Sequence, residues 1–290
     1  MQKKVYAILN IENPIVAWEV AIGRIKSVPE SEYNINNSWL SNWSYSLLRK
    51  YATKGNIYSF INELKLEQIR LDNYQNSVSR LRGIYFFENI EDAYAAIDRW
   101  GFKSNLKKYI SEVLITVNKL TKVDSEWITF YLGNKNNNDQ WIHNYWQGKI
   151  HGEKPLYELI IEGVGYVLNQ EIRKEAYSKI YYKYPTATPL LAMACCAFNV
   201  SGIEDIAISR GYLTSSNDKI LGQYIMNIGI LKEQEQEISK AINISKERNQ
   251  LPPSILPQDG KSFFTIPDFR DHFFEIENPV AMNIYKDVHR

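Results

Sequence analysis

One carboxylate interrupts an otherwise apolar segment near the middle of the chain. The segment PLYELII, residues 155–161, alternates as a strand, and Glu158 falls on a face that is otherwise apolar. A carboxylate in that position is paired with a cation, placed at a solvent-facing strand edge, or used for function. Arg173 and Lys154 are the cations that we consider for the pairing alternative.

An aromatic strand and an alanine-rich helix form a second feature. The strand-like run VSRLRGIYFF, residues 78–87, contains Gly83 and Tyr85, and the segment ENIEDAYAAIDRWG after it predicts a helix. A further strand-like run, ISEVLITV, spans residues 110–117. An aromatic side chain in a strand either packs in the core or stacks on a planar ligand, and both roles stay open for Tyr85.

The elements that must position these residues mix strands and helices. Strand-like runs lie at residues 3–9, 78–87, 109–117, 125–132, 155–163 and 164–170. The segment SWLSNWSYSLLRKY, residues 38–51, brings Trp39, Trp43 and Leu47 onto one face of a predicted helix, and residues 57–71 predict another.

After residue 171 the periodicity is mainly helical. Residues 188–200, TPLLAMACCAFNV, are apolar nearly all round, which is typical of a buried helix. Residues 215–242 predict a long amphipathic helix. We therefore expect an α+β protein with a mixed part over 1–170 and a mainly helical part over 171–290, as one domain or two.

Composition excludes several classes of protein. Lys and Arg number 34 and Asp and Glu 33, and a net charge of +1 excludes a uniformly basic DNA-coating protein but leaves a local basic groove open. Cys195 and Cys196 are adjacent, so no disulfide framework is expected, which fits a reducing cytoplasm. The longest apolar stretch, residues 190–198, is too short to span a membrane, and no signal peptide is seen. We expect a cytoplasmic protein without a membrane partner.

The common catalytic and nucleotide-binding motifs are absent from the sequence. We find no P-loop, no GxGxxG, no zinc-protease HExxH and no nucleophile elbow. His143 and His151 stand near Asp139 and Glu153 in a polar segment, which is a weak metal signal, and we expect no metal site.

Taken in order, the segments GIYFF, EDAYAA, SEVLITV and YELII resemble the ADP-ribosyltransferase superfamily. In that superfamily a Gly-x-Tyr-Phe strand precedes a helix with small residues, and a later strand carries the catalytic glutamate. LEQIRLDNYQNSVSRLRGIYFF, NYWQGK and PLYELIIEG also resemble a bacterial and phage family of ADP-ribosyltransferase-like proteins. The resemblance covers residues 80–160 and says nothing about 171–290. It implies a split antiparallel β-sheet core with helices and an NAD-binding domain over residues 1–170.

The same resemblance implies the activity and the central site residues. NAD would be the substrate from which ADP-ribose is transferred to a macromolecule, either a protein or a nucleic acid. Glu158 would be the catalytic carboxylate that stabilises the ribose cation as nicotinamide leaves. Tyr85 would stack on the nicotinamide ring, and Gly83 would let NAD approach the backbone.

Further residues take supporting roles by the same resemblance. Ser79 and Arg80 would contact the ribose or the phosphates of NAD. Tyr145 and Trp146, in NYWQGK, would shape the pocket or the target surface, and a place in the core is the equal alternative for both.

Two positions depart from the pattern of the superfamily. The first strand, KVYAILN, lacks the usual His or Arg that holds the adenosine ribose, so Asn10, Tyr6 or Arg24 would take that role. Arginine-modifying members carry Glu or Gln two residues before the catalytic glutamate, and here that residue is Leu156. Another residue type or a nucleic-acid base is therefore the more expected acceptor.

Three functional hypotheses remain open. The first is a mono-ADP-ribosyltransferase, acting as a toxin or effector, to which a neutralising protein partner could bind. The second is a catalytically inactive NAD-binding or protein-interaction module that kept the fold. The third is an NAD glycohydrolase, in which water is the acceptor.

Overall fold

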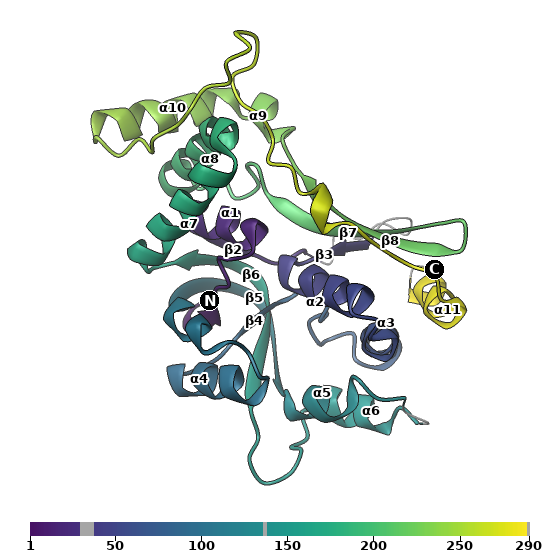
Figure 1. The fold of residues 1–290 in the computed structure, drawn as a ribbon. Coiled ribbons are helices and arrows are strands. Elements are labelled where there is room, and N and C mark those ends of the chain that lie inside the picture. The colour runs from purple at the N-terminus through teal and green to yellow at the C-terminus, as the bar shows by residue number, and fades with distance from the viewer. Residues whose placement is uncertain (30–37, 136–137, 289–290) are drawn as a thin grey trace.

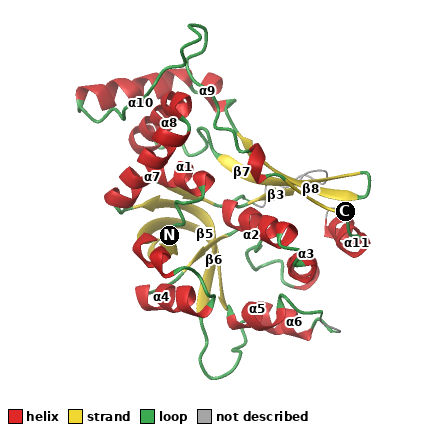
Figure 2. Cartoon of the chain, in the orientation of Figure 1, coloured by secondary structure: helices red, strands yellow, loops and turns green. Residues whose placement is uncertain are grey.

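The computed structural model describes residues 1–29, 38–135 and 138–288 (Figure 1). Figure 2 shows helices packed around two groups of strands. Both β-sheets are antiparallel, so the α+β class predicted from the sequence is confirmed. In the described part of the chain, no helix is both long enough and apolar enough to cross a membrane.

The larger sheet is built on one long antiparallel pair of strands. These are β5 (Ile110–Asp124) and β6 (Tyr157–Val167), which stay in register except for a shift between Val117 and Lys119. β1 (Gln2–Ile8) pairs with the first half of β5, as the β-rich run at the N-terminus predicts. β6 is therefore a central strand.

The other edge of β6 is divided between two short strands. β2 (Arg24–Lys26) pairs with the C-terminal half of β6, and β4 (Ile84–Phe86) pairs with its N-terminal half. Main-chain hydrogen bonds of 2.8 and 2.9 Å join Tyr6 of β1 to Phe87, so the sheet curls back toward its first strand.

A group of helices covers one side of this sheet (Figure 1). They are α1 (Pro14–Ile22), α7 (Gln170–Lys183), α8 (Thr188–Ser201) and α10 (Glu235–Glu247). Trp18 of α1, Val113 of β5 and Leu190 of α8 belong to one continuous cluster of buried apolar residues. The division predicted at residue 170 therefore does not separate two hydrophobic cores.

The smaller sheet also joins distant parts of the chain. Its strands, in spatial order, are β3 (Ser38–Leu40), β7 (Ser209–Ser216), β8 (Lys219–Met226) and β9 (Phe274–Ile276). Its apolar face packs with α2 (Asn42–Thr53), α3 (Ile57–Asn73) and α11 (Pro279–Val288). The other elements among the described residues are α4 (Ile90–Arg99), α5 (Glu126–Tyr131), α6 (Gln140–Trp146), α9 (Ile230–Glu233) and 3-10 turns at Ser104–Tyr109, Pro185–Ala187 and Arg270–His272.

The helix predicted over residues 215–242 is wrong in its first half. Residues 209–226 form the β7–β8 hairpin, and within the predicted range the helices are α9 and the first part of α10. Asn217 and Asp218 make the turn with φ of +48° and +60°. Asn and Asp tolerate this left-handed conformation, which the tight turns of two-residue hairpins require. The expectation of a mainly helical second part therefore omitted β7, β8 and β9.

Two shorter predictions are also wrong. Residues 125–132, predicted as a strand, contain α5, whose first N–H, that of Glu126, donates a hydrogen bond of 3.1 Å to the Asp124 carboxylate. Residues 38–40, predicted as the start of a helix, are β3, and α2 begins only after Ser41, whose hydroxyl accepts from the Ser44 N–H. The helices predicted at 57–71 and 188–200 are confirmed.

Candidate active site

Two neighbouring pockets share the side chains of Trp43 and Tyr85. The first, which we call the Glu158 pocket, has a volume of about 440 Å³ and is lined by Trp43, Leu47, Lys50, Tyr51, Asn56, Ser59, Arg80, Tyr85, Arg99, Trp100, Phe102, Ser125, Ile128, Thr129, Leu132, Gly133 and Glu158. The second, which we call the Arg24 pocket, is lined by Ala7, Ile8, Leu9, Asn10, Val16, Glu19, Val20, Arg24, Ile25, Lys26, Asn42, Trp43, Ile84, Tyr85, Phe86, Ile208 and Ser209. The two shared rings are 6.0 Å apart, centre to centre, and form the wall between the pockets.

Glu158 lies near the start of β6 and is only 4% exposed. Among the described residues no cation forms an ion pair with it, and Arg173 instead donates to the Ile22 carbonyl and to Asn199. Burial raises the pKa of Glu158 from its usual 4.5 to about 7, against the opposing effect of Arg80. An ion pair between Glu158 and Arg173 is therefore excluded, and the Glu158 carboxylate lines the pocket without a cationic partner.

Arg80 supplies a fixed positive charge at the same pocket. Its guanidinium donates two hydrogen bonds of 3.0 Å to the carboxylate of Glu63 and a third, of 2.7 Å, to the hydroxyl of Tyr145. It also stacks over the ring of Tyr85, 5.2 Å from the ring centre. Because all these contacts are buried, the guanidinium has one orientation beside Glu158.

Tyr85 stands between the two pockets on β4. Its hydroxyl donates a hydrogen bond of 2.8 Å to the main-chain oxygen of Arg80, which fixes the ring. Burial raises the pKa of Tyr51, Tyr85 and Tyr145 above the usual range, so these hydroxyls stay neutral. Neutral phenols and the fixed guanidinium of Arg80 therefore lie near the acid.

The structure brings some of the predicted site residues together and leaves others behind the site. Glu158, Tyr85 and Arg80 line one pocket, and Tyr145 lies behind it, bonded to Arg80. Ser79 does not line either pocket, since its hydroxyl donates to the buried carboxylate of Glu67 at 2.8 Å.

Gly83 has a different role from the predicted one. A Cβ atom on Gly83 would lie 2.5 Å from the side chain of Ile160 and 2.9 Å from the main-chain oxygen of Ser79. The lack of a side chain is therefore required for packing against β6, and Gly83 does not line either pocket. Trp146 packs in the core, where its indole donates to the Leu66 carbonyl at 3.0 Å.

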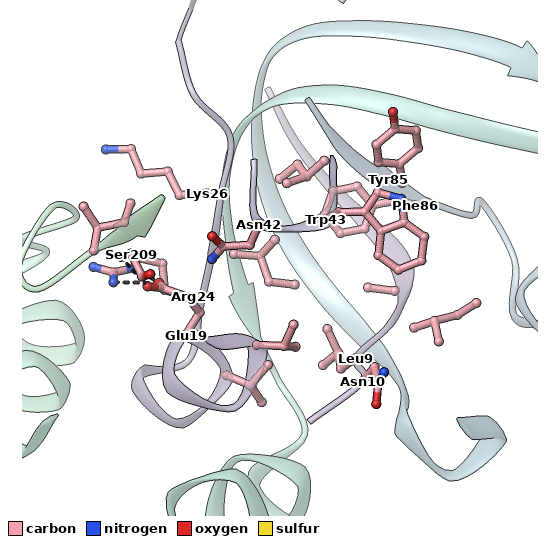
Figure 3. A pocket seen from close by; sticks show the side chains of 17 residues that line it. Leu9, Asn10, Glu19, Arg24, Lys26, Asn42, Trp43, Tyr85, Phe86 and Ser209 are labelled. Carbon is pink, nitrogen blue, oxygen red and sulfur yellow. Dashed lines mark hydrogen bonds and ion pairs between the residues drawn. The ribbon is translucent and has the colours of Figure 1, made fainter. Parts of the chain in front are cut away.

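The Arg24 pocket combines apolar walls with polar atoms that have no hydrogen bond. Among the described residues, the side-chain oxygens of Asn10, Asn42 and Ser209 are buried and unbonded. Arg24 of β2 forms an ion pair of 2.6 Å with Glu19. Figure 3 shows this ion pair on one side of the pocket and Trp43 on the other. Buried polar atoms without a partner are costly, so such a pocket is suited to a ligand that bonds them.

Sequence reasoning missed several of these residues. Trp43 and Leu47 were expected on the apolar face of a helix, and that face of α2 lines the Glu158 pocket. Asn42 precedes them and Ser209 comes from β7, far along the chain. No local pattern marks Asn42 or Ser209, because only the fold brings them to the pocket.

The histidines of the weak metal signal lie apart from the site. His143 contacts the hydroxyl of Tyr74 at 3.0 Å, and His151 packs on the ring of Trp127, 4.6 Å away. Within the described ranges, no three His, Cys, Asp or Glu side chains group as metal ligands would.

One family model matches residues 10–175, which is more than half of the chain, and its description is "Protein of unknown function (DUF2441)". No curated protein and no solved structure matches the chain. The matched span includes Asn10, Arg24, Arg80, Tyr85 and Glu158, so most of the lining of both pockets falls within it.

Proposed function

The chain belongs to the family described as DUF2441, and for it we propose the transfer of ADP-ribose from NAD to a macromolecule, with Glu158 as the catalytic carboxylate. The observation that carries the proposal is the position of Glu158, buried without an ion pair in a pocket that the rings of Tyr85 and Trp43 close on one side. This site also fits the resemblance of residues 80–160 to ADP-ribosyltransferases.

The chemistry uses the carboxylate as a counter-charge. The bond between nicotinamide and C1′ of the ribose breaks, nicotinamide leaves with the electron pair, and the ribose gains positive charge. The acceptor then bonds to C1′ and releases one proton. A carboxylate in a water-poor pocket stabilises this developing cation more strongly than it would in water. Among the described residues that line this pocket, Glu158 is the acid, and it would act in its ionised form.

The two pockets suit the two halves of a dinucleotide. The nicotinamide ring would stack on Tyr85, with its ribose beside Glu158. The adenosine half would lie in the Arg24 pocket, where the unbonded oxygens of Asn10 and Asn42 accept hydrogen bonds from amino or hydroxyl groups. Arg24, on the second strand, would then take the role that a His or Arg on the first strand has in the superfamily.

Leu156 bears on the choice of acceptor. It is 1% exposed and packs in the apolar cluster beneath α4, so it offers no group that could hold an arginine side chain. We therefore propose an acceptor other than arginine.

Radiolabelled NAD, incubated with the protein and a cell lysate, tests the proposal. We expect label on a macromolecule with the wild type and loss of that label with Glu158→Gln. Glu162→Gln, on the same strand but outside both pockets, is the matched control and should keep it. Equal labelling by wild type and Glu158→Gln would overturn the site.

Two other outcomes would redirect the proposal. Free ADP-ribose without a labelled macromolecule would make the protein an NAD glycohydrolase. Calorimetry that finds NAD binding but no turnover would make it an inactive binding module, and calorimetry without NAD binding would reject NAD as the ligand.

A further inference from the structure

We propose that the acceptor is a base of single-stranded nucleic acid, which binds across the mouth of the Glu158 pocket. This inference rests on the proposed function. It comes from the charges and rings around the mouth, and it selects the nucleic-acid base from the acceptors that the family resemblance leaves open.

Three lysines on or next to the pocket lining lack an acidic partner. Lys50 lines the pocket, Lys54 is the C-cap residue of α2 one helical turn later, and Lys103 directly follows the lining residue Phe102. All three are exposed, and among the described residues none forms an ion pair with them. We call these three lysines the basic rim. Arg99 also lines the pocket, but its charge is balanced by Glu126 at 2.9 Å.

The basic rim lies close to partly exposed aromatic rings. The ammonium of Lys50 is 5.9 Å from the centre of the Phe102 ring, and Phe102 lies 5.8 Å from Trp100. Trp43 is half-buried at the inner wall. Proteins that bind single strands combine cations for the backbone with aromatic faces on which the bases stack.

The depth of Glu158 favours a single strand over a duplex. The carboxylate is 4% exposed, so an acceptor atom must enter the pocket to reach the ribose beside it. A paired base cannot present its edge in that way without leaving the stack. An unpaired base can enter while its neighbouring phosphates stay on the basic rim.

The transfer step balances with such an acceptor. A nitrogen of the base forms the bond to C1′ as the bond from C1′ to nicotinamide breaks. Nicotinamide leaves with the electron pair of that bond, and the proton of the base nitrogen passes to solvent. A cationic peptide would be repelled by the lysines, so an acidic polypeptide is the protein alternative that the test must separate.

Fluorescence anisotropy with labelled oligonucleotides of about 12 nucleotides tests this inference in the absence of NAD. We expect the full-length protein to bind single strands more tightly than a duplex of the same sequence. The triple variant Lys50→Gln, Lys54→Gln and Lys103→Gln should bind about tenfold more weakly, and its log–log salt slope should fall by about 2, from three lost phosphate contacts.

A matched control removes the same charge elsewhere. Lys232→Gln, Lys240→Gln and Lys246→Gln lie on α9 and α10, away from α2 and β4 (Figure 1), and should leave binding unchanged. Equal binding by both triple variants, equal affinity for duplex and single strand, or no oligonucleotide binding would overturn the inference. Stronger competition by polyglutamate than by unlabelled oligonucleotide would also overturn it, in favour of an acidic protein.

The outcomes separate this inference from the proposed function. Glu158→Gln should bind oligonucleotides like the wild type and yet transfer no label. Oligonucleotide binding without NAD binding would defeat the proposed function and leave the single-strand binding surface standing. If label appears only on protein, in a lysate whose nucleic acids have not been digested, the nucleic-acid acceptor is ruled out and the proposed function stands.

Discussion

Both carboxylate oxygens of Glu63 accept hydrogen bonds of 3.0 Å from the guanidinium of Arg80. The two side chains are 4% and 3% exposed, and Arg80 also lines the pocket of Glu158. Arg80 is thus bonded to Glu63 and at the same time lowers the pKa of Glu158. Burial raises that pKa by more, so the pKa of Glu158 stays above its usual value. This relationship makes Glu158 an acid that changes charge near neutral pH.

The Glu63–Arg80 pair should be strongly coupled in stability. Glu63→Gln leaves a buried guanidinium with a weaker partner, and we expect a loss of about 3–5 kcal/mol in the free energy of unfolding. The double variant Glu63→Gln, Arg80→Met should lose less than the sum of the two single variants. Urea unfolding of the four proteins measures this coupling, and additive losses would contradict it.

The exposed pair of Glu171 and Lys174 on α7 provides the control for that cycle. Both side chains are largely exposed, so Glu171→Gln should cost less than about 1 kcal/mol. A similar loss in the free energy of unfolding at both sites would mean that burial does not cause the large effect expected for the Glu63–Arg80 pair.

Glu158 should make stability depend on pH in a defined window. Its pKa is about 7 in the folded protein and 4.5 as the usual value, so between these values the folded state binds more protons than the unfolded state. Stability from this group is therefore highest below pH 4.5, falls as pH rises, and is flat above about pH 7. As the pH rises from 4.5 to about 7, the free energy of unfolding of Glu158→Gln should therefore increase by about 3 kcal/mol relative to that of the wild type.

Thermal and urea unfolding of both proteins at the two ends of this window checks the prediction. Glu162→Gln on the same strand should show no such relative gain, since it lies outside the pocket. A constant difference between wild type and Glu158→Gln across the window would contradict the raised pKa.

Alternation over residues 155–161 predicted that Glu158 interrupts an apolar strand face, and in the structure Glu158 is buried in a pocket that it shares with Arg80. The β7–β8 hairpin was not predicted, because its apolar residues also fit a helical face and the Asn217–Asp218 turn was not recognised. Ser209 reaches the Arg24 pocket only through that hairpin. Contacts between residues far apart in sequence leave no local periodicity, so this part of the site could not be predicted.

Gly83→Ala separates a packing role from a ligand role. The added Cβ would meet Ile160 at 2.5 Å, and we expect a loss of about 1–3 kcal/mol in stability with unchanged NAD affinity of the folded protein. Gly229→Ala, whose nearest new contact is at 3.5 Å, should change stability by less than about 0.5 kcal/mol. Calorimetry showing that a stably folded Gly83→Ala has lost NAD binding would restore the cofactor role.

The rate of transfer should rise with pH as Glu158 ionises. With a pKa of about 7, the ionised fraction grows about tenfold between about pH 6 and pH 8, and the rate should follow it. The profile of labelled product against pH measures this. A rate that falls over the same range would assign the protonated acid, and not the carboxylate, to the reaction.

Release of nicotinamide from NAD at about pH 8 tests the central role of Glu158 most directly, because it reports bond cleavage whichever acceptor follows. We predict release by the wild type and by Glu162→Gln, and a loss of at least about a hundredfold with Glu158→Gln. Equal release by Glu158→Gln and the wild type would contradict that role, and so would no release by any of the three proteins with a lysate present.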